Sequence, residues 1–115
     1  MRIQELDIVG AYLIENYLHK DNRGLFVKPF SNAESMFNGQ KFDINEIYYS
    51  ISNKNVIRGM HFQTPSMDHE KLIYLTQGRI TDVLLDIRKH SPTYKQYMAI
   101  DLSAHINALF VPKGV

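Results

Sequence analysis

The stretch Arg79-Ile80-Thr81-Asp82-Val83-Leu84-Leu85-Asp86-Ile87 decides the fold class of this chain, because the character of its side chains alternates. Successive side chains of a β-strand point to opposite faces of the sheet. Here one face is continuously apolar, and the other mixes Ile80 and Leu84 with Asp82 and Asp86. The pattern predicts a β-strand with two carboxylates on a partly apolar face, where an acid either points into a polar cavity or pairs with a cation.

Charged side chains near strand ends raise the same alternatives. Asp86 is expected to form a structural ion pair with Arg88 or Lys89, since carboxylates in such surroundings are often structural. Lys71 shares one face of its predicted strand with apolar residues. Its ammonium group therefore lies over apolar neighbours or reaches solvent from the strand end.

Short runs rich in Ile, Val, Tyr and Phe recur along the chain between turn signals such as Asp21-Asn22-Arg23-Gly24. They predict strands at Val9 to Glu15, Leu25 to Phe30, Ile44 to Ser52, Val56 to Gln63, Lys71 to Thr76, Arg79 to Ile87, Tyr97 to Leu102 and Ala108 to Val111. Only Ser31 to Asn38 is expected to be helical, with Gly39 after its end. About eight strands in one small domain predict an all-β sandwich or jelly-roll barrel.

The composition excludes several function classes. A length of 115 residues fits a single domain over 1–115, and a net charge of +1 lacks the basic excess of a nucleic-acid binder. The absence of cysteine removes disulfides and thiolate zinc sites and is consistent with a reducing compartment. No apolar run is long enough to span a bilayer. We expect a cytoplasmic protein with no nucleic-acid or membrane partner.

The run Ile57-Arg58-Gly59-Met60-His61-Phe62-Gln63 combines a side chain that titrates near neutral pH with a permanent cation. Together they suggest proton transfer on an anionic substrate. Strict alternation places Arg58 and His61 on opposite faces of the predicted strand, unless Gly59 forms a bulge that brings both to one pocket. Taken alone, His61 is equally well explained as a structural histidine.

Metal binding is another use of histidine. The chain has five histidines, but Gln63 stands where a His-x-His pair starting at His61 needs the second imidazole. A site made of His61, His69 and Glu70 is conceivable from spacing alone. We expect no metal and no cofactor.

Several motifs in the same order cover nearly all of the chain. They are Asp21-Asn22-Arg23-Gly24-Leu25-Phe26, Val56 to Gln63, Lys71 to Gly78, Asp82 to Thr93 and Phe110-Val111-Pro112-Lys113-Gly114. In this order they resemble the dTDP-4-dehydrorhamnose 3,5-epimerase family. The resemblance implies a metal-free jelly-roll barrel of the cupin type (a double-stranded β-helix), a homodimer, and a nucleotide-diphosphate sugar as substrate. The family inverts C3 and C5 of a dTDP-4-keto-6-deoxyhexose, in deoxysugar biosynthesis of the rhamnose type.

The resemblance also implies roles for individual residues. His61 matches the general base, and Lys71 matches the lysine that stabilises the enolate oxygen. Arg23 and Arg58 match arginines that contact the diphosphate and sugar, and Phe26 matches an aromatic residue of the pocket. The chemistry agrees, since an enolate is best stabilised by a cation in a dry site, proton removal near neutral pH suits an imidazole, and a diphosphate suits arginine.

Other positions depart from the family pattern. Lys28 stands where the family usually has a glutamate, and Glu46-Ile47-Tyr48 stands in place of a Gln-x-Asn pair. These positions contact the nucleotide in the family, so the base and the sugar stay open. We retain Lys28, Glu46, Tyr48 and Gln63 as candidate substrate-binding residues.

The family continues beyond the position of Gly114, and its catalytic tyrosine, the aspartate that orients the base and a further pocket histidine lie there. We therefore expect a C-terminally truncated fragment, an incomplete barrel with an open sheet edge. A 3,5-epimerase is the main expectation. The alternatives are a non-catalytic sugar-nucleotide-binding module on the same barrel and a 3,4-ketoisomerase of the same fold.

Overall fold

The computed structural model describes residues 2–33, 36–37 and 39–115, and its regular elements in these ranges are all β-strands. The strands are β1 (Arg2–Glu5), β2 (Tyr12–Glu15), β3 (Tyr17–Asp21), β4 (Gly24–Lys28), β5 (Met36–Phe37), β6 (Gln40–Lys41), β7 (Lys71–Tyr74), β8 (Arg79–Leu85), β9 (Tyr97–Ser103) and β10 (Asn107–Val111). This confirms the all-β class. Within these ranges, none of the chain forms a helix long and apolar enough to cross a membrane.

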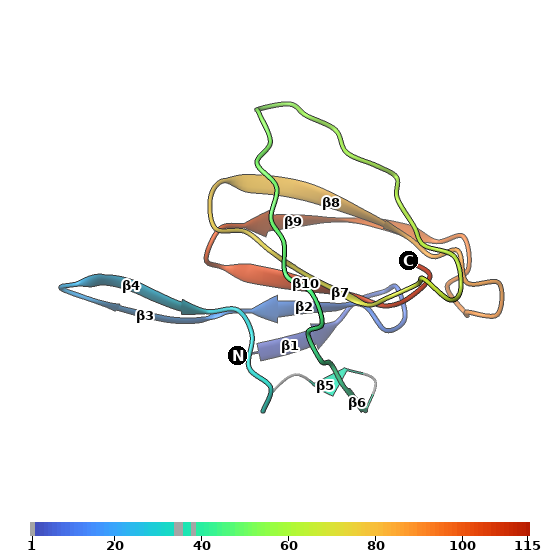
Figure 1. Cartoon of the computed structure of the whole chain (residues 1–115), viewed down its shortest axis with the longest axis horizontal. Helices are drawn as coiled ribbons and strands as arrows, with labels where there is room; N and C mark the ends of the chain where they lie inside the picture. Colours follow the sequence, from blue (N-terminus) through green and yellow to red (C-terminus); the bar gives the residue numbers. More distant parts are fainter. Residues whose placement is uncertain (1, 34–35, 38) are drawn as a thin grey trace.

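Strand β10 lies inside the four-stranded antiparallel sheet, whose order is β1-β2-β10-β7 (Figure 1). Its register pairs Phe110 with Tyr12 of β2 on one side and with Leu72 of β7 on the other. All of its residues from Ala108 to Val111 are at most 3% exposed. Both faces of this strand therefore pack against other parts of the chain.

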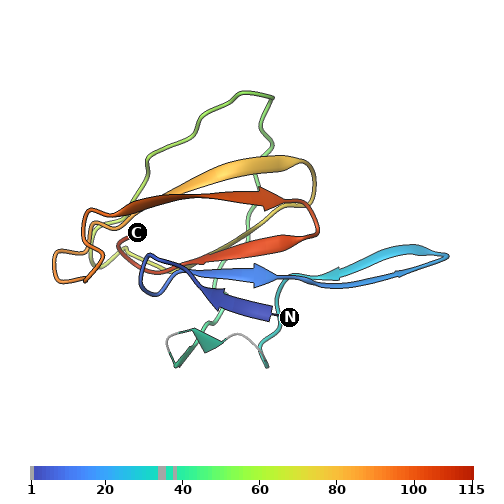
Figure 2. The same cartoon turned by 180° about the vertical axis from the view of Figure 1, so that it is seen from behind.

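The ribbon formed by β8 and β9 packs against one face of this sheet, as Figures 1 and 2 show from opposite sides. The core between the two layers joins buried side chains of β8, β9 and β10, namely Leu84, Ile100, Leu102, Leu109 and Val111. Ile73 and Leu75 pack against this core from β7 and its end. Each fully buried aliphatic side chain contributes about 1.5–3 kcal/mol to folding.

The opposite face of the four-stranded sheet carries an aromatic cluster. Phe37 of β5 stacks on Phe110 with ring centroids 4.0 Å apart, and Phe42 meets Phe110 edge-on at 5.4 Å. Offset stacked and edge-to-face contacts are the arrangements that aromatic rings prefer. The short β5–β6 hairpin is thereby fixed against the sheet.

The β3–β4 hairpin differs from the rest because it extends away from both layers (Figures 1 and 2). Its apolar side chains are largely exposed, including Tyr17, Leu18, Leu25 and Phe26. The described part of the chain therefore leaves the apolar side chains of this hairpin largely uncovered.

Several predicted elements are wrong. Ile44 to Ser52 and Val56 to Gln63 run as extended chain without strand pairing, and Ile47 and Ile57 are 76% and 93% exposed. In the predicted helix, residues 31–33 form no helix and Met36–Phe37 is a strand, while residues 34, 35 and 38 lie outside the described residues. Strands β1, β3 and β6 were not predicted, because their mostly exposed residues give little apolar alternation.

Asp86 closes the end of β8 as a buried anion. The Arg88 side chain donates two hydrogen bonds to it, from Nε at 2.9 Å and from Nη2 at 2.7 Å, and the backbone N–H of Arg88 donates a third at 2.9 Å. The hydroxyls of Ser91 and Thr93 each donate at 2.6 Å. The predicted structural ion pair with Arg88 is confirmed. Burial by itself raises the pKa of Asp86, but these hydrogen bonds outweigh burial and hold the pKa far below the usual range.

Replacing Asp86 is expected to lower stability strongly. Asp86→Ala leaves the Arg88 cation without its buried partner, so we expect the free energy of unfolding in urea to fall by about 3 kcal/mol at pH 7. Asp43→Ala removes an exposed ion pair with Lys41 and is the control, with a loss below about 1 kcal/mol.

The same carboxylate predicts a pH dependence. A pKa lowered on folding stabilises the protein fully above the ordinary aspartate pKa of about 3.9, and that stability is lost as the pH falls below it. The wild-type midpoint should therefore fall more steeply than that of Asp86→Asn below about pH 4. Equal slopes in the two proteins would contradict this assignment.

Candidate functional site

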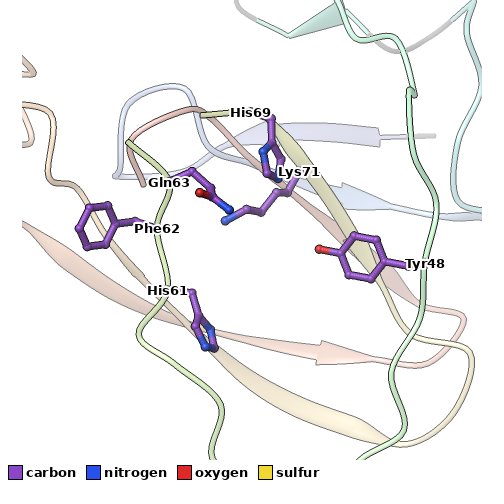
Figure 3. Close-up of a pocket in the computed structure, with 6 residues that line it drawn as sticks. All are labelled: Tyr48, His61, Phe62, Gln63, His69 and Lys71. Carbon is purple, nitrogen blue, oxygen red and sulfur yellow. The ribbon is translucent and has the colours of Figure 1, made fainter. Parts of the chain in front are cut away.

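A pocket of about 400 Å³ lies where the extended segment 44–70 passes beside β7. This volume is in the range of about 300–1,000 Å³ that small-molecule sites occupy. The side chains that line it are Tyr48, His61, Phe62, Gln63, His69 and Lys71 (Figure 3). In this view His69, Gln63 and Lys71 lie at one end, His61 lies at the other, and the Tyr48 hydroxyl points across.

The register of the sheet places Lys71 in this pocket. Lys71 pairs with Val111, and both lie on the face that packs toward the core between the layers. Ile73, two residues further along β7, contributes to the same core. The predicted face of Lys71 is therefore confirmed, and its ammonium group extends past apolar neighbours into the pocket.

His61 reaches the pocket from the other wall, which is not a strand. Its segment is exposed, and Gly59 adopts φ +117°, a conformation that residues with a side chain rarely adopt. A Cβ at Gly59 would lie 3.5 Å from Nδ1 of His61. The imidazole thus lies against the backbone at Gly59, in a segment that forms no strand and so does not contain the expected bulge.

Arg58 does not join His61 in the pocket. Its Nε donates to Oγ of Ser52 at 2.9 Å and its Nη2 to the carbonyl of Ile51 at 3.3 Å. These bonds tie the two ends of the turn 52–58 together. In this structure Gly59 does not bring Arg58 into the pocket, and the substrate-binding role of Arg58 stays a prediction.

The candidate residues of the projecting hairpin also lie away from the pocket. Arg23, at its tip, donates from Nη2 to Asp21 at 2.6 Å, and hydrogen bonds from Arg23 lower the pKa of the Asp21 carboxyl. Phe26 is 57% exposed and meets Tyr17 edge-on, while Lys28 lies over the Tyr17 ring. None of these side chains lines the pocket of its own chain.

The other sequence candidates divide in the same way. Tyr48 and Gln63 line the pocket, whereas Glu46 is exposed on the segment that approaches it. His69 also lines the pocket, and its Nδ1 bonds the carbonyl of Met67 at 3.1 Å. A carbonyl only accepts, so Nδ1 carries the proton and Nε2 is left for a ligand. The sequence pointed to His69 only as a metal ligand, although it stands two residues before Lys71.

The metal alternative finds no support in the geometry. In residues 2–33, 36–37 and 39–115, no three His, Asp or Glu side chains come together as a metal site would require. His61, His69 and Glu70 are therefore not arranged as a ligand set. The pocket instead combines a cation, two imidazoles, an amide and a phenol.

This combination suits a polar ligand that undergoes proton transfer. An imidazole exchanges protons near neutral pH, and an ammonium group stabilises a developing oxyanion. The fold and the pocket thus define an all-β protein of two packed strand layers, with a polar cavity beside β7.

Comparison with known proteins identifies the family. Residues 5–115 match the family model described as dTDP-4-dehydrorhamnose 3,5-epimerase. The epimerase of Mycolicibacterium smegmatis is 38% identical over 101 residues, which are 87% of this chain and 50% of that protein. The chain thus spans about half the length of this relative. It belongs to the dTDP-4-dehydrorhamnose 3,5-epimerase family.

Solved structures agree in fold. The Bacillus anthracis epimerase with TDP and PPi bound is 35% identical with a TM-score of 0.86, over 98% of this chain and 66% of that one. The Legionella pneumophila epimerase in complex with dTDP-4-keto-L-rhamnose is 30% identical with a TM-score of 0.80, over 98% and 61%. The cupin-type jelly roll predicted from the sequence is confirmed.

Gly59 offers a direct test of the pocket geometry. We expect Gly59→Ala to displace the His61 imidazole, because alanine disfavours φ +117° by about 1–3 kcal/mol and the exposed segment yields before the core does. The measurement is the shift of the His61 ring signals in ¹H–¹³C NMR spectra. Gly78→Ala, at φ +78° with open space around it, is the control and should leave those signals in place.

Proposed function

We propose that this protein is an epimerase that acts at C3, C5 or both of a dTDP-4-keto-6-deoxyhexose, in deoxysugar biosynthesis of the rhamnose type. The observation that carries the proposal is that His61 and Lys71, from separate segments, line one pocket in a chain of this family. The ligands named for the Bacillus anthracis and Legionella pneumophila structures support a thymidine-diphosphate sugar as the substrate class. No cofactor is needed for the reaction.

The chemistry is a proton transfer next to a ketone. The His61 imidazole removes the proton from the carbon α to the C4 carbonyl, and the electron pair of the C–H bond moves to the carbonyl oxygen. The Lys71 ammonium group stabilises the enolate oxygen that forms. The enolate collapses when a proton is added to the opposite face of the same carbon. The resemblance assigns that second proton carrier to a tyrosine beyond Gly114.

Two features support a homodimer. The pocket has an exposed outer wall, yet a cation stabilises an enolate best where water is excluded. The projecting hairpin carries the candidate residues Arg23 and Phe26 on a largely exposed apolar surface that its own chain does not cover. A second copy that receives this hairpin over its pocket supplies both the missing cover and the missing substrate contacts. We therefore propose that each site combines His61 and Lys71 of one copy with the hairpin of the other.

Solvent exchange tests the reaction. With the full protein in heavy water, deuterium should enter C3 or C5 of the 4-keto sugar nucleotide, as followed by NMR. His61→Ala should reduce the rate by about 10²–10⁴-fold, the usual contribution of a general base. His90→Ala, which changes an exposed histidine outside the pocket, should not.

The alternatives give different results in the same experiment. A binding module without activity would show a thermal shift with the nucleotide sugar and no deuterium incorporation. A 3,4-ketoisomerase would move the ketone to C3, which product analysis by NMR detects. Either outcome replaces the epimerase proposal. The cytoplasmic location inferred from the sequence remains a prediction.

Mixed dimers test the exchanged hairpin. Arg23→Ala and His61→Ala should each be nearly inactive alone, whereas co-refolded mixtures should recover about a quarter of the wild-type rate, because half of the dimers are mixed and carry one intact site. Size-exclusion chromatography should show dimers in every sample. A mixture as inactive as its components would show that each hairpin serves its own chain.

A further inference from the structure

Asp82 lies on the interior face of β8. It pairs directly with Ile100 of β9, and its neighbours on the same face, Leu84 and Ile100, are both part of the core between the two layers. The mixed face of this strand is thus the interior one, whereas Val83 on the continuously apolar face is 43% exposed. Asp82 therefore points into the space between the two layers.

Lys71 points into the same space from the facing sheet. It pairs with Val111, which belongs to that same core, and its side chain ends in the pocket beside His61. The Lys71 ammonium group and the Asp82 carboxylate thus enter the same interlayer space from opposite sides. Their strands, β7 and β8, are consecutive in the chain but lie in different layers.

Among the described residues, Lys71 and Asp82 interact electrostatically but form no direct ion pair. Burial raises the pKa of Asp82, and the positive charge of Lys71 and a backbone hydrogen bond from Val83 oppose that rise. No direct ion pair joins Lys71 and Asp82 within the described part of the chain. Asp82 therefore does not occupy an N–H donor of the Lys71 ammonium group that a ligand could use.

The other acid on this face cannot serve the same purpose. Asp86 is already bound by Arg88, Ser91 and Thr93. The other polar side chains that line the pocket are His61, His69, Tyr48 and Gln63, and none of them is a carboxylate. Asp82 is therefore the carboxylate of β8 that is left to face Lys71 across the space between the two layers.

We propose that Asp82 is a positioning residue for Lys71, whose carboxylate keeps the lysine charged and directed into the pocket without occupying its donors. The proposal extends the proposed function, because only a charged Lys71 stabilises an enolate. Asp82 itself takes no part in the proton transfer and need not contact the substrate.

The first test needs no activity. In competitive acetylation with acetic anhydride, only the uncharged amine reacts, so the labelling of Lys71 relative to exposed Lys20 reports its charge. Asp82→Asn should raise this ratio by about three- to tenfold at pH 8, the scale of a charge interaction across a partly solvated gap. Asp101→Asn, on the exposed face and hydrogen-bonded to Thr81, is the matched control and should leave it unchanged. An unchanged ratio in Asp82→Asn overturns the proposal.

The second test uses the reaction. Asp82→Asn should lower kcat for deuterium exchange by about tenfold with little change in KM, since the ground-state ligand contacts remain. Asp82→Glu, which restores the charge, should recover most of the rate. A loss that Asp82→Glu does not recover contradicts the charge role. If the wild-type protein shows no exchange, the epimerase proposal fails while the acetylation result still decides the role of Asp82.

Loss of folding would not obscure the outcome. Burial disfavours the Asp82 carboxylate, so a neutral amide there should leave the melting temperature unchanged or higher. Asp82→Ser is a smaller neutral replacement for which the same rise in Lys71 labelling is expected. Two folded neutral variants without that rise would exclude a charge effect of Asp82 on Lys71.

Discussion

The structure depends on the burial of β10 on both of its faces. Leu109 and Val111 pack into the core between the two layers, and Ala108 and Phe110 pack into the aromatic cluster on the other side. A strand in this position fixes its neighbours, because a slip of one residue would exchange the two faces. The pairing of Lys71 with Val111 is one result of this register. The burial of β10 on both faces therefore also fixes the face of the sheet on which Lys71 lies.

The sequence predicts the parts of this fold in which local pattern and burial agree. The alternation of Arg79 to Ile87 identified β8, and the faces inferred for Lys71 and Asp86 hold in the structure. Val56 to Gln63 is equally rich in strand-forming residues, yet it has no pairing partner among the described residues. A strand needs hydrogen bonds from a neighbour as well as suitable side chains, and a single sequence does not reveal that neighbour.

The site shows the same division. Lys71 could be placed from the register of one strand, whereas the pocket walls that hold Tyr48 and His69 depend on the path of a long irregular segment. Arg58 illustrates the limit, because its bonds to Ser52 and Ile51 arise from a turn that alternation does not describe. Arg23 and Phe26 lie on the β3–β4 hairpin, and neither of them lines the pocket.

One wall of the pocket is a paired β-strand and the other is an irregular segment, and this difference affects the free energy of ligand binding. Lys71 stands on a paired strand, whereas the hydrogen bonds within the described residues of the segment that carries His61 are short-range, such as those from Val56 to Asn53 and from Met67 to Thr64. If a ligand fixes such a segment, the free energy of binding becomes less favourable by about 1–2 kcal/mol of backbone conformational entropy for each residue that becomes ordered. The affinity of a ligand for this pocket therefore depends on the conformational entropy that the His61 segment loses on binding, as well as on the contacts that the ligand makes.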